Sequence, residues 1–459
     1  MDLKGKKVIV LGLGDTGLSM AKWLHRQGAH VAAADSRAEP PRAGDLARAL
    51  PGVAIELGEF REDSLRGADL IALSPGIDAR TPAIAAAIRG GMPVTGDIEL
   101  FSQALGLRAR RPAIIAVTGT NGKSTVTHMA GDICAASGQR TLVAGNIGTP
   151  VLDALTQIEQ GSADEPEIVV LELSSFQLET TATLAPDAAT MLNLSEDHLD
   201  RYEGMADYAA AKARVFLGEG TQVLNRDDRA SLAMTLPGRL QSTFALDAPA
   251  GPREWGLIAD DGERWLARGG ERLLAARELP LAGLHNAANA LAAGALCQAI
   301  GVGDAVFARA ARSFRGLPHR LEHVAAREGV DFYDDSKGTN VGAAAAALEG
   351  FTRPVVLIAG GDGKQQDFSP LREPVKRRAR AVVLIGRDAG LLAAALDGSG
   401  IPLHRAIDMD EAVRVAYALT RPGDAVLLSP ACASYDMFRS YVHRGQVFAA
   451  SARKLAQHG

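Results

Sequence analysis

The sequence has few cysteines, no long apolar run near its start and no large excess of charge. Each of these features argues against certain classes of protein. Cys134, Cys297 and Cys432 are the three cysteines in 459 residues; they lack metal-ligand spacing, which fits a reducing cytosol. The first apolar stretch is broken at Gly12, well before the length of a signal peptide or membrane span. A net charge of −5 argues against a dedicated nucleic-acid surface. We expect a soluble, cytoplasmic protein with no nucleic-acid partner and no membrane insertion.

What the sequence does contain is ample material for several packed cores. Hydrophobic residues make up 47% of the chain and charged residues 22%, and a chain of this length typically holds about three domains. Short β-branched runs that end in polar turns alternate with helical patterns in each third of the chain. This alternation predicts an α/β fold with parallel sheets. Residues 221–280 predict a β-rich segment without readable chemistry.

The most informative stretch is residues 112–127, PAIIAVTGTNGKSTVT. Ala113–Val117 predicts a buried strand, a Gly-rich turn follows, and a helical pattern begins near Lys123 and Ser124. Backbone amides at such a helix start can surround a phosphate, the lysine adds a positive charge, and the serine can ligate Mg²⁺. The spacing is imperfect, because Val117 stands where the leading glycine is usual and Gly119 comes two positions late. The alternative is a Gly-rich turn with an exposed lysine, but the flanking strand and helix favour nucleoside-triphosphate binding.

A second Gly-rich turn lies near the N-terminus. The strand predicted at Lys7–Leu11 runs into Gly12-Leu13-Gly14-Asp15-Thr16-Gly17, and a following strand, His30–Ala34, ends at Asp35. Taken alone, this pattern indicates a dinucleotide-binding oxidoreductase, with the acid on a ribose hydroxyl. A nicotinamide-dependent dehydrogenase is therefore the main alternative function, and a non-catalytic nucleotide switch is another.

Chemically useful side chains follow other predicted strands of the central region. Glu172 lies near the end of a strongly β-forming run, His198 follows the next run, and Lys212 lies on a helix predicted over Met205–Phe216. Because ligands bind at the carboxyl ends of strands in α/β sheets, Lys123, Glu172 and His198 are expected to converge. Without further context, the alternatives are a capping carboxylate, a packed histidine and a helix-surface lysine.

Several motifs together resemble the Mur ligases of peptidoglycan synthesis. They are TGTNGKST at 118–125, LELSSFQLE at 171–179, EDHLDRY at 196–202, GLPHR at 316–320 and DDSKGTN at 334–340. Three others resemble the branch of that family that adds D-glutamate: GDIELF at 96–101, GGDGKQQDFSP at 360–370 and LLSPACAS at 427–434. The DNPR motif of the branch that adds a diamino acid is not found in the sequence. Folylpolyglutamate synthase shares the later motifs but lacks the N-terminal domain.

The resemblance implies an architecture and a reaction. It implies a Rossmann-like domain at 1–96 that binds a UDP-linked substrate, a central P-loop ATPase-like domain with a parallel sheet at 97–316, and a C-terminal Rossmann-like α/β domain at 317–459 that binds the amino acid. The implied enzyme is a monomeric, ADP-forming ligase that joins D-glutamate to UDP-N-acetylmuramoyl-L-alanine through an acyl phosphate. Its implied co-substrate is ATP, with two Mg²⁺ ions.

The resemblance also assigns roles to residues, with Lys123, Glu172, His198 and Lys212 as the catalytic set. The implied ATP contacts are Gly119, Thr120, Asn121, Gly122, Lys123, Ser124, Thr125, Asn286, Asn289, Arg320, Asp335 and Lys337. The implied contacts to the UDP-substrate are Asp15, Thr16, Asp35, Ser36, Arg37, Ser74, Gly76, Asn146, Ser174, Gln177 and His198. Those to D-glutamate are Thr339, Lys364, Ser434, Tyr435 and Tyr441. One Mg²⁺ is assigned to Ser124 and Glu172, and a second to Glu172, His198 and Lys212, the last as a carbamate.

Two further expectations follow from these assignments. The asparagines Asn286 and Asn289 have a competing role as N-caps of the Ala-rich helix that begins near them. Arg320, Asp335 and Lys337 lie beyond a hinge predicted at residues 316–320, so closure of the third domain is expected to complete the ATP site.

Overall fold

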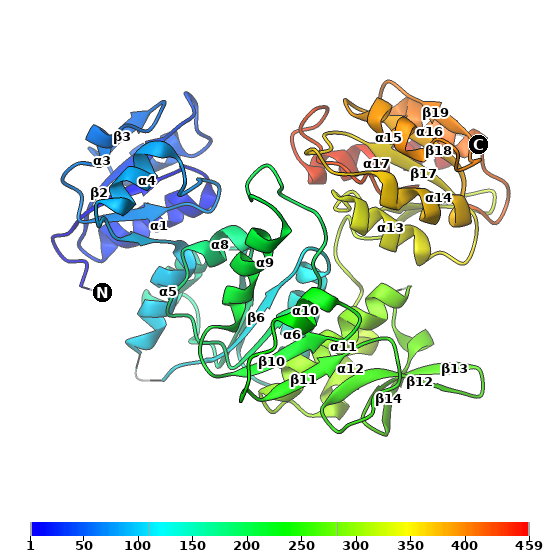
Figure 1. Cartoon of the computed structure of the whole chain (residues 1–459), viewed down its shortest axis with the longest axis horizontal. Helices are drawn as coiled ribbons and strands as arrows, with labels where there is room; N and C mark the ends of the chain where they lie inside the picture. The colour runs from blue at the N-terminus through cyan, green and yellow to red at the C-terminus, as the bar shows by residue number, and fades with distance from the viewer. Residues whose placement is uncertain (1, 109, 282, 458–459) are drawn as a thin grey trace.

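The computed structural model folds the chain into three α/β units, each built around its own sheet (Figure 1). The structure describes residues 2–108, 110–281 and 283–457. The N-terminal and C-terminal units lie on opposite sides of the view, and the central unit lies below and between them. The expected fold class, three α/β domains with parallel sheets, is confirmed.

The N-terminal unit has a five-stranded, fully parallel sheet in the order β3-β2-β1-β4-β5. Its elements are β1 (Lys7–Leu11), α1 (Asp15–Arg26), β2 (His30–Asp35), α2 (Ala43–Ala49), β3 (Ala54–Leu57), α3 (Glu62–Leu65), β4 (Leu70–Leu73), α4 (Pro82–Arg89) and β5 (Val94–Thr95). The Gly-rich turn after β1 allows close packing, because a Cβ on Gly17 would lie 1.8 Å from the carbonyl oxygen of Gly12.

The central unit has a nine-stranded sheet in the order β14-β13-β12-β11-β10-β9-β6-β8-β7. Its strands are β6 (Ala113–Thr118), β7 (Thr141–Gly145), β8 (Ile168–Glu172), β9 (Ala188–Met191), β10 (Thr221–Asn225), β11 (Gln241–Phe244), β12 (Glu254–Asp260), β13 (Glu263–Arg268) and β14 (Glu271–Ala275). Among these strands, β13 pairs antiparallel with both β12 and β14, and the other pairs are parallel. The β-rich segment predicted over 221–280 thus forms β10 to β14, at one end of this sheet.

The helices of the central unit cover both faces of that sheet. They are α5 (Asp97–Gly106), α6 (Lys123–Ala136), α7 (Val151–Glu159), α8 (Ser175–Glu179), α9 (Met205–Ala213), α10 (Arg229–Ala233), α11 (Leu284–Ala299) and α12 (Asp304–Ser313). The helix predicted over Met205–Phe216 has its last three residues in a 3-10 turn, Arg214–Phe216.

The C-terminal unit has a six-stranded sheet in the order β15-β16-β20-β17-β18-β19, and only β15 runs antiparallel to its neighbour. The strands are β15 (Glu322–Arg327), β16 (Val330–Asp334), β17 (Val355–Gly360), β18 (Ala379–Ile385), β19 (Leu403–Arg405) and β20 (Ala425–Leu428). The helices are α13 (Val341–Glu349), α14 (Arg372–Arg378), α15 (Ala389–Leu396), α16 (Met409–Ala418) and α17 (Tyr441–Gln457).

The central strands are apolar on both sides because helices cover both faces of a parallel sheet. Along β6, Ile114 and Ala116 join a core that continues into the N-terminal unit, whereas Ile115 and Val117 pack in the core with α6 and α11. Full burial of an isoleucine or valine contributes roughly 1.5–3 kcal/mol. The strand is therefore held rigidly, and the loop that follows it inherits a fixed position.

The N-terminal unit is joined to the central unit by apolar and charged contacts. Their shared core includes Trp23 of α1 and Leu152 of α7. Arg201 of the central unit donates to the carbonyl oxygen of Ile77 at 3.2 Å and lies 3.3 Å from a carboxylate oxygen of Asp78. In the part of the chain that the structure describes, no helix is long and apolar enough to cross a membrane.

Candidate functional site

A cavity of about 830 Å³ lies between the central and C-terminal units. Among the residues that line it are many of the predicted site residues: Thr120, Asn121, Gly122, Lys123, Ser124, Thr125, Asn146, Glu172, Ser174, His198, Lys212, Asn286, Asn289, Arg320, Asp335, Lys337, Thr339, Lys364, Ser434, Tyr435 and Tyr441. The fold thus brings together the predicted ATP, metal and D-glutamate residues from two separate units. Another cavity, of about 490 Å³ near α1 and α5, contains none of them.

The phosphate loop joins β6 to α6. Gly119 and Gly122 have positive φ angles of 149° and 83°, and a Cβ on Gly122 would lie 2.6 Å from the amide oxygen of Asn289. Gly122 is also the N-cap of α6, so no side chain occupies the first amide groups of this 14-residue helix. These free amides and the positive helix end favour an anion at this position.

Lys123 is less exposed than the sequence suggested, and the idea of an exposed lysine on the turn is wrong. Its side chain is partly buried, and its ammonium donates to the carbonyl oxygens of Gly119 and Thr120, each at 2.8 Å. Burial lowers the pKa of Lys123, and the nearby carboxylates of Glu172 and Asp197 oppose that effect. The lysine is therefore folded back on its own loop, within the cavity.

Glu172 ends β8 and is almost fully buried, with 2% of its surface exposed. Its Oε1 accepts a hydrogen bond from the side-chain amide of Asn146 at 3.0 Å. Its Oε2 is buried and has no partner among the residues that the structure describes. Because a buried carboxylate oxygen without a partner is costly, this atom fits a ligand of a hard cation such as Mg²⁺.

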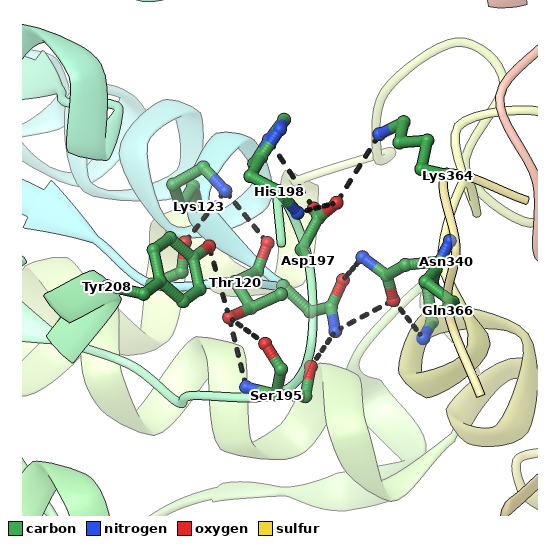
Figure 2. A network of polar contacts seen from close by, with 12 residues as sticks. Thr120, Lys123, Ser195, Asp197, His198, Tyr208, Asn340, Lys364 and Gln366 are labelled. Atoms are coloured by element: carbon green, nitrogen blue, oxygen red, sulfur yellow. Dashed lines mark hydrogen bonds and ion pairs between the residues drawn. The ribbon is translucent and has the colours of Figure 1, made fainter. Parts of the chain in front are cut away.

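Asp197 and His198 lie between Lys123 of the phosphate loop and Lys364, as Figure 2 shows. Oδ1 of Asp197 is 3.3 Å from the ammonium of Lys364, a residue of the C-terminal unit. Burial raises the pKa of Asp197, but Lys364, His198 and Lys123 together hold it below its ordinary value. Burial lowers the pKa of His198, which favours the neutral imidazole that a metal requires.

Lys212 is not the surface residue that an isolated reading of its helix suggests. Only 1% of it is exposed, and its ammonium donates to the carbonyl oxygen of Gly119 at 2.8 Å. It also lies 4.6 Å from the centre of the Tyr208 ring. Burial, and then the nearby charge of Lys123, lowers the pKa of Lys212 well below its ordinary value. This site therefore favours a neutral amine.

The two predicted asparagines of α11 lie inside its first turns. The helix begins at Leu284 with Gly283 at the N-cap position, so the N-capping role for Asn286 and Asn289 is wrong. The amide of Asn289 donates to Oδ1 of Asn286 at 3.3 Å. Both residues line the cavity beside the phosphate loop.

The C-terminal unit adds cations to the other wall of the cavity. Arg320 donates to the hydroxyl of Ser124 at 2.6 Å. The ammonium of Lys337 lies 4.1 Å from the centre of the Tyr441 ring, and burial lowers its pKa to about 8. Burial raises the pKa of Asp335 to about 7. The carboxylate of Asp335 accepts a hydrogen bond from the hydroxyl of Ser429 at 2.6 Å.

The predicted D-glutamate residues Thr339, Lys364, Ser434, Tyr435 and Tyr441 surround the same part of the cavity. Ser434 is buried, with 3% of its surface exposed, whereas Tyr435 is 76% exposed.

Sequence reasoning gave no role to two residues that shape the site, Asp197 and Arg444. Arg444 is 1% exposed, and its guanidinium donates to Ser336 and to the carbonyl oxygens of Cys432 and Ala433. It thus holds two loops of the wall together. Asp197 lies within the EDHLDRY motif, which could have indicated a role in the site. For Arg444 the sequence offered only its charge, which does not indicate a buried, structural role.

The predicted UDP-substrate residues of the N-terminal unit lie apart from this cavity. Asp15 and Thr16 begin α1 after the turn from β1, Asp35 ends β2, and the turns after β2 and β4 carry Ser36, Arg37, Ser74 and Gly76. Because these strands are parallel neighbours, the turns meet at one edge of the first sheet. None of these seven residues is among those that line the 830 Å³ cavity.

Asp35 has a local role that weakens the dinucleotide interpretation. Its side chain is completely buried, and it accepts hydrogen bonds from the backbone of Leu13 at 2.6 Å and from the guanidinium and backbone of Arg37. Burial raises the pKa of Asp35, but these hydrogen bonds lower it below its ordinary value. In this arrangement the carboxylate holds the Gly-rich turn and presents Arg37 to the edge of the sheet.

Gln177 has a similar anchoring role within the central unit. It is 2% exposed, forms a capping box with Ser174 at the start of α8, and donates to a carboxylate oxygen of Asp97 at 2.9 Å. Ser174 faces the cavity, whereas Gln177 fixes the position of the turn that carries it.

Comparison with known proteins gives matches across all three units. The description "Mur ligase MurD-like, N-terminal domain" matches residues 6–96, "Mur ligase middle domain" matches 117–297, and "Mur ligase, glutamate ligase domain" matches 319–432.

Full-length relatives carry a single name. The UDP-N-acetylmuramoylalanine--D-glutamate ligase of Methylobacillus flagellatus is 55% identical over 455 residues, which covers 99% of this chain and 98% of that protein. The protein of the same name from Nitrosospira multiformis is 55% identical over 458 residues, 99% of this chain and 97% of that protein.

Solved structures with the same architecture are more distant in sequence. The alanine ligase MurC of Thermotoga maritima matches with a TM-score of 0.61 at 20% identity, over 98% of this chain and all of that one. MurF of Acinetobacter baumannii matches with a TM-score of 0.61 at 17% identity, over 97% of this chain and 93% of that one. These two similarities support the fold alone.

Proposed function

The chain belongs to the Mur ligase family, and from this we propose that it joins D-glutamate to UDP-N-acetylmuramoyl-L-alanine in peptidoglycan precursor synthesis, with conversion of ATP to ADP and phosphate. The full-length relatives at 55% identity support this choice of substrates. The observation that carries the proposal is the cavity itself, in which the phosphate loop faces Lys364 and Ser434. Such a cavity suits a reaction between a nucleotide-activated acid and an amino acid.

The reaction consists of two steps, a phosphoryl transfer and the formation of an amide. A carboxylate oxygen of the alanyl group attacks the γ-phosphorus of ATP, the bond to ADP breaks, and an acyl phosphate forms. The amine of D-glutamate then attacks the acyl carbon, the amine gives up a proton, phosphate leaves and an amide results. The first step brings a carboxylate to a polyanion, so its rate depends on positioning and on nearby positive charge.

The residues of this chain supply that charge from both walls. In the proposal, the loop 119–125 surrounds the phosphates with backbone amides, and Lys123 turns from its carbonyl partners to the phosphate oxygens. Arg320, Asp335 and Lys337 reach the nucleotide from the C-terminal unit, while Asn286 and Asn289 lie on its adenine side. Because these groups belong to two units, approach of the units assembles the site.

The residues around Glu172 suit Mg²⁺, since its buried Oε2 has no hydrogen-bond partner in residues 2–108, 110–281 and 283–457. We assign one ion to Ser124 and Glu172 and a second to Glu172, His198 and a carbamate on Lys212. When bound, Mg²⁺ offsets negative charge on the transferring phosphoryl group. The carbamate forms when the neutral amine of Lys212 adds to CO₂ and releases a proton. This reaction replaces a buried ammonium by two oxygen atoms of the kind that Mg²⁺ prefers.

The substrates are placed at the two ends of the site. In the proposal, D-glutamate binds to Thr339, Lys364, Ser434, Tyr435 and Tyr441, and Asn146, Ser174 and His198 contact the muramoyl-alanine portion, with Gln177 holding the turn of Ser174. The UDP portion binds at the edge of the first sheet, against Asp15, Thr16, Asp35, Ser36, Arg37, Ser74 and Gly76. The enzyme acts in the cytoplasm as a monomer.

One assay tests this function against its alternatives. Purified protein should release phosphate from ATP only when both UDP-N-acetylmuramoyl-L-alanine and D-glutamate are present. Phosphate release that does not depend on either substrate would indicate a nucleotide switch. Oxidation of NADH without ATP consumption would indicate a dehydrogenase.

A further inference from the structure

Two asparagine side chains pair across the central and C-terminal units. The amide nitrogen of Asn340 donates to Oδ1 of Asn121 at 3.0 Å, and the amide nitrogen of Asn121 donates to Oδ1 of Asn340 at 3.3 Å. Figure 2 shows Asn340 within this network, beside Gln366. Asn340 is 4% exposed. The two amides therefore satisfy each other where the units meet.

The central partner is fixed firmly within the phosphate loop. The backbone amide of Asn121 donates to Oδ1 of Asn193 at 2.8 Å, and the side chain of Asn193 donates back to the carbonyl oxygen of Asn121 at 3.1 Å. Asn193 lies just beyond β9, a buried strand of the central sheet. The side chain of Asn121 therefore has the position that the phosphate loop gives it.

The C-terminal partner is equally fixed, next to predicted D-glutamate residues. Oδ1 of Asn340 also accepts from the backbone of Ala343 at 2.8 Å and so caps α13. The following residue, Val341, donates to the side chain of Gln366 at 3.1 Å, and Gln366 donates to the carbonyl oxygen of Gly363 at 2.9 Å. Through its neighbour Val341, Asn340 is thus linked to the turn that carries Lys364, and it directly follows Thr339.

Other contacts between these units use groups that the proposed substrates require. Arg320 bonds to Ser124, a proposed metal ligand, and Lys364 pairs with Asp197, although the lysine is proposed to bind a carboxylate of D-glutamate. Those contacts must change when the substrates enter. The asparagine pair is neutral, and Asn340 has no proposed substrate contact, so the pair can persist through binding.

We propose that Asn340 is a positioning residue that couples nucleotide binding at the phosphate loop to D-glutamate binding in the C-terminal unit. This inference rests on the proposed ligase function. Coupling of this kind means that each ligand tightens the binding of the other by the same factor. Loss of two neutral hydrogen bonds is expected to reduce that factor by about 5- to 150-fold, with a floor at no coupling.

Asn340→Ser separates the pairing from the cap. Serine is about as good an N-cap as asparagine, but its hydroxyl replaces the amide that reaches Asn121. Asp408→Ala is the matched control, because Asp408 caps α16 of the same unit through the backbone of Glu411 at 2.8 Å. Asn340→Ala removes both the cap and the pair. Thermal melting should therefore be lowered in the two alanine variants, and Asn340→Ser, which keeps the cap, should melt above Asn340→Ala.

The decisive measurement is the affinity of the full-length protein for a non-hydrolysable ATP analogue, with UDP-N-acetylmuramoyl-L-alanine present and with or without D-glutamate. The unaltered protein and Asp408→Ala should bind the analogue more tightly when D-glutamate is added. In Asn340→Ser this gain should shrink toward none, and kcat/KM for D-glutamate should fall about 5- to 150-fold. In Asn121→Ala/Asn340→Ser the coupling should be no weaker than in either single variant, because one missing partner already breaks the pair.

The outcomes separate the two hypotheses. If the unaltered protein turns over normally and Asn340→Ser keeps the full gain, the coupling role is wrong and the ligase function stands. If the unaltered protein shows no phosphate release that depends on D-glutamate, the proposed function is wrong and the coupling falls with it.

Discussion

Lys212→Met asks whether the buried lysine serves chemistry rather than the fold. Methionine keeps an unbranched apolar chain of similar bulk in a site where the lysine is 1% exposed. The carbonyl oxygen of Gly119 loses one donor but keeps Lys123, whose ammonium lies 2.8 Å away. The substitution therefore leaves no buried acceptor without a partner.

The expected change in stability is small. The variant loses one hydrogen bond, about 1 kcal/mol, and little attraction to the Tyr208 ring, because the buried amine favours its neutral form. It also removes an amine whose charged form is penalised by burial, as the lowered pKa of Lys212 indicates. The free energy of unfolding should stay within about 2 kcal/mol of the unaltered protein. Activity should fall at least about 100-fold, as expected when a metal loses a ligand.

Companion variants distinguish a carbamate from a positive charge. Lys212→Arg keeps the charge but cannot form this carbamate, and should be as inactive as Lys212→Ala. The alanine variant leaves space in which acetate or formate can replace the missing carboxylate, so either acid should restore part of its activity. Phosphate release with both substrates measures activity, and thermal melting measures stability. Turnover close to normal in Lys212→Arg would refute the carbamate, and a collapse of melting temperature in Lys212→Met would refute the separation of chemistry from fold.

Three further predictions follow from single residues. Lys123→Ala should abolish ligation and keep the fold, because the ammonium bonds only to loop carbonyls in the described structure; unchanged phosphate release would contradict the phosphate-loop assignment. Lys364→Ala should raise KM for D-glutamate at least about 10-fold, as loss of a charged hydrogen bond predicts, with KM for ATP nearly constant; a rise for ATP instead would place the lysine at the nucleotide. Burial raises the pKa of Asp97 from 3.8 to about 6, so between those values the folded chain holds a proton that the unfolded chain has released, and this contribution is lost as pH rises through 6. Asp97→Asn should therefore stabilise the protein by up to about 3 kcal/mol at pH 7 and by little at pH 4, and urea unfolding with equal stabilisation at both pH values would refute this.

The sequence by itself determined the elements whose causes are local. The β-branched run before Thr118, the glycines after it and the helix from Lys123 predicted the phosphate loop, because strand formation, positive φ angles and helix starts depend on neighbouring residues. The same reasoning indicated that Lys123, Glu172 and His198 share a sheet edge, and the cavity contains all three. Long ordered motifs predicted the family, which the comparisons show.

Local sequence patterns did not predict the surroundings of residues whose contacts come from elsewhere in the fold. The first turns of α11 contain Asn286 and Asn289, yet the helix starts earlier, at Leu284, with a glycine at its cap. Lys212 lies on a helix that is mostly small residues, and nothing in its spacing shows that packing excludes solvent from its ammonium. The spacing that places Asp35 in a ribose-binding fingerprint also did not show that its oxygens accept hydrogen bonds from the backbone of Leu13 and the side chain of Arg37.

Only the tertiary structure decided the pairings between units. Asn121 meets Asn340, and Asp197 meets Lys364, although each pair is far apart in the chain. Such contacts depend on how two separately folded sheets are placed by their whole packed surfaces, and no local periodicity encodes that placement. The burial that leaves Oε2 of Glu172 without a partner and lowers the pKa of Lys212 arises in the same way. The sequence therefore determined which chemical groups are available, and the packing of the units determined which of them face one another.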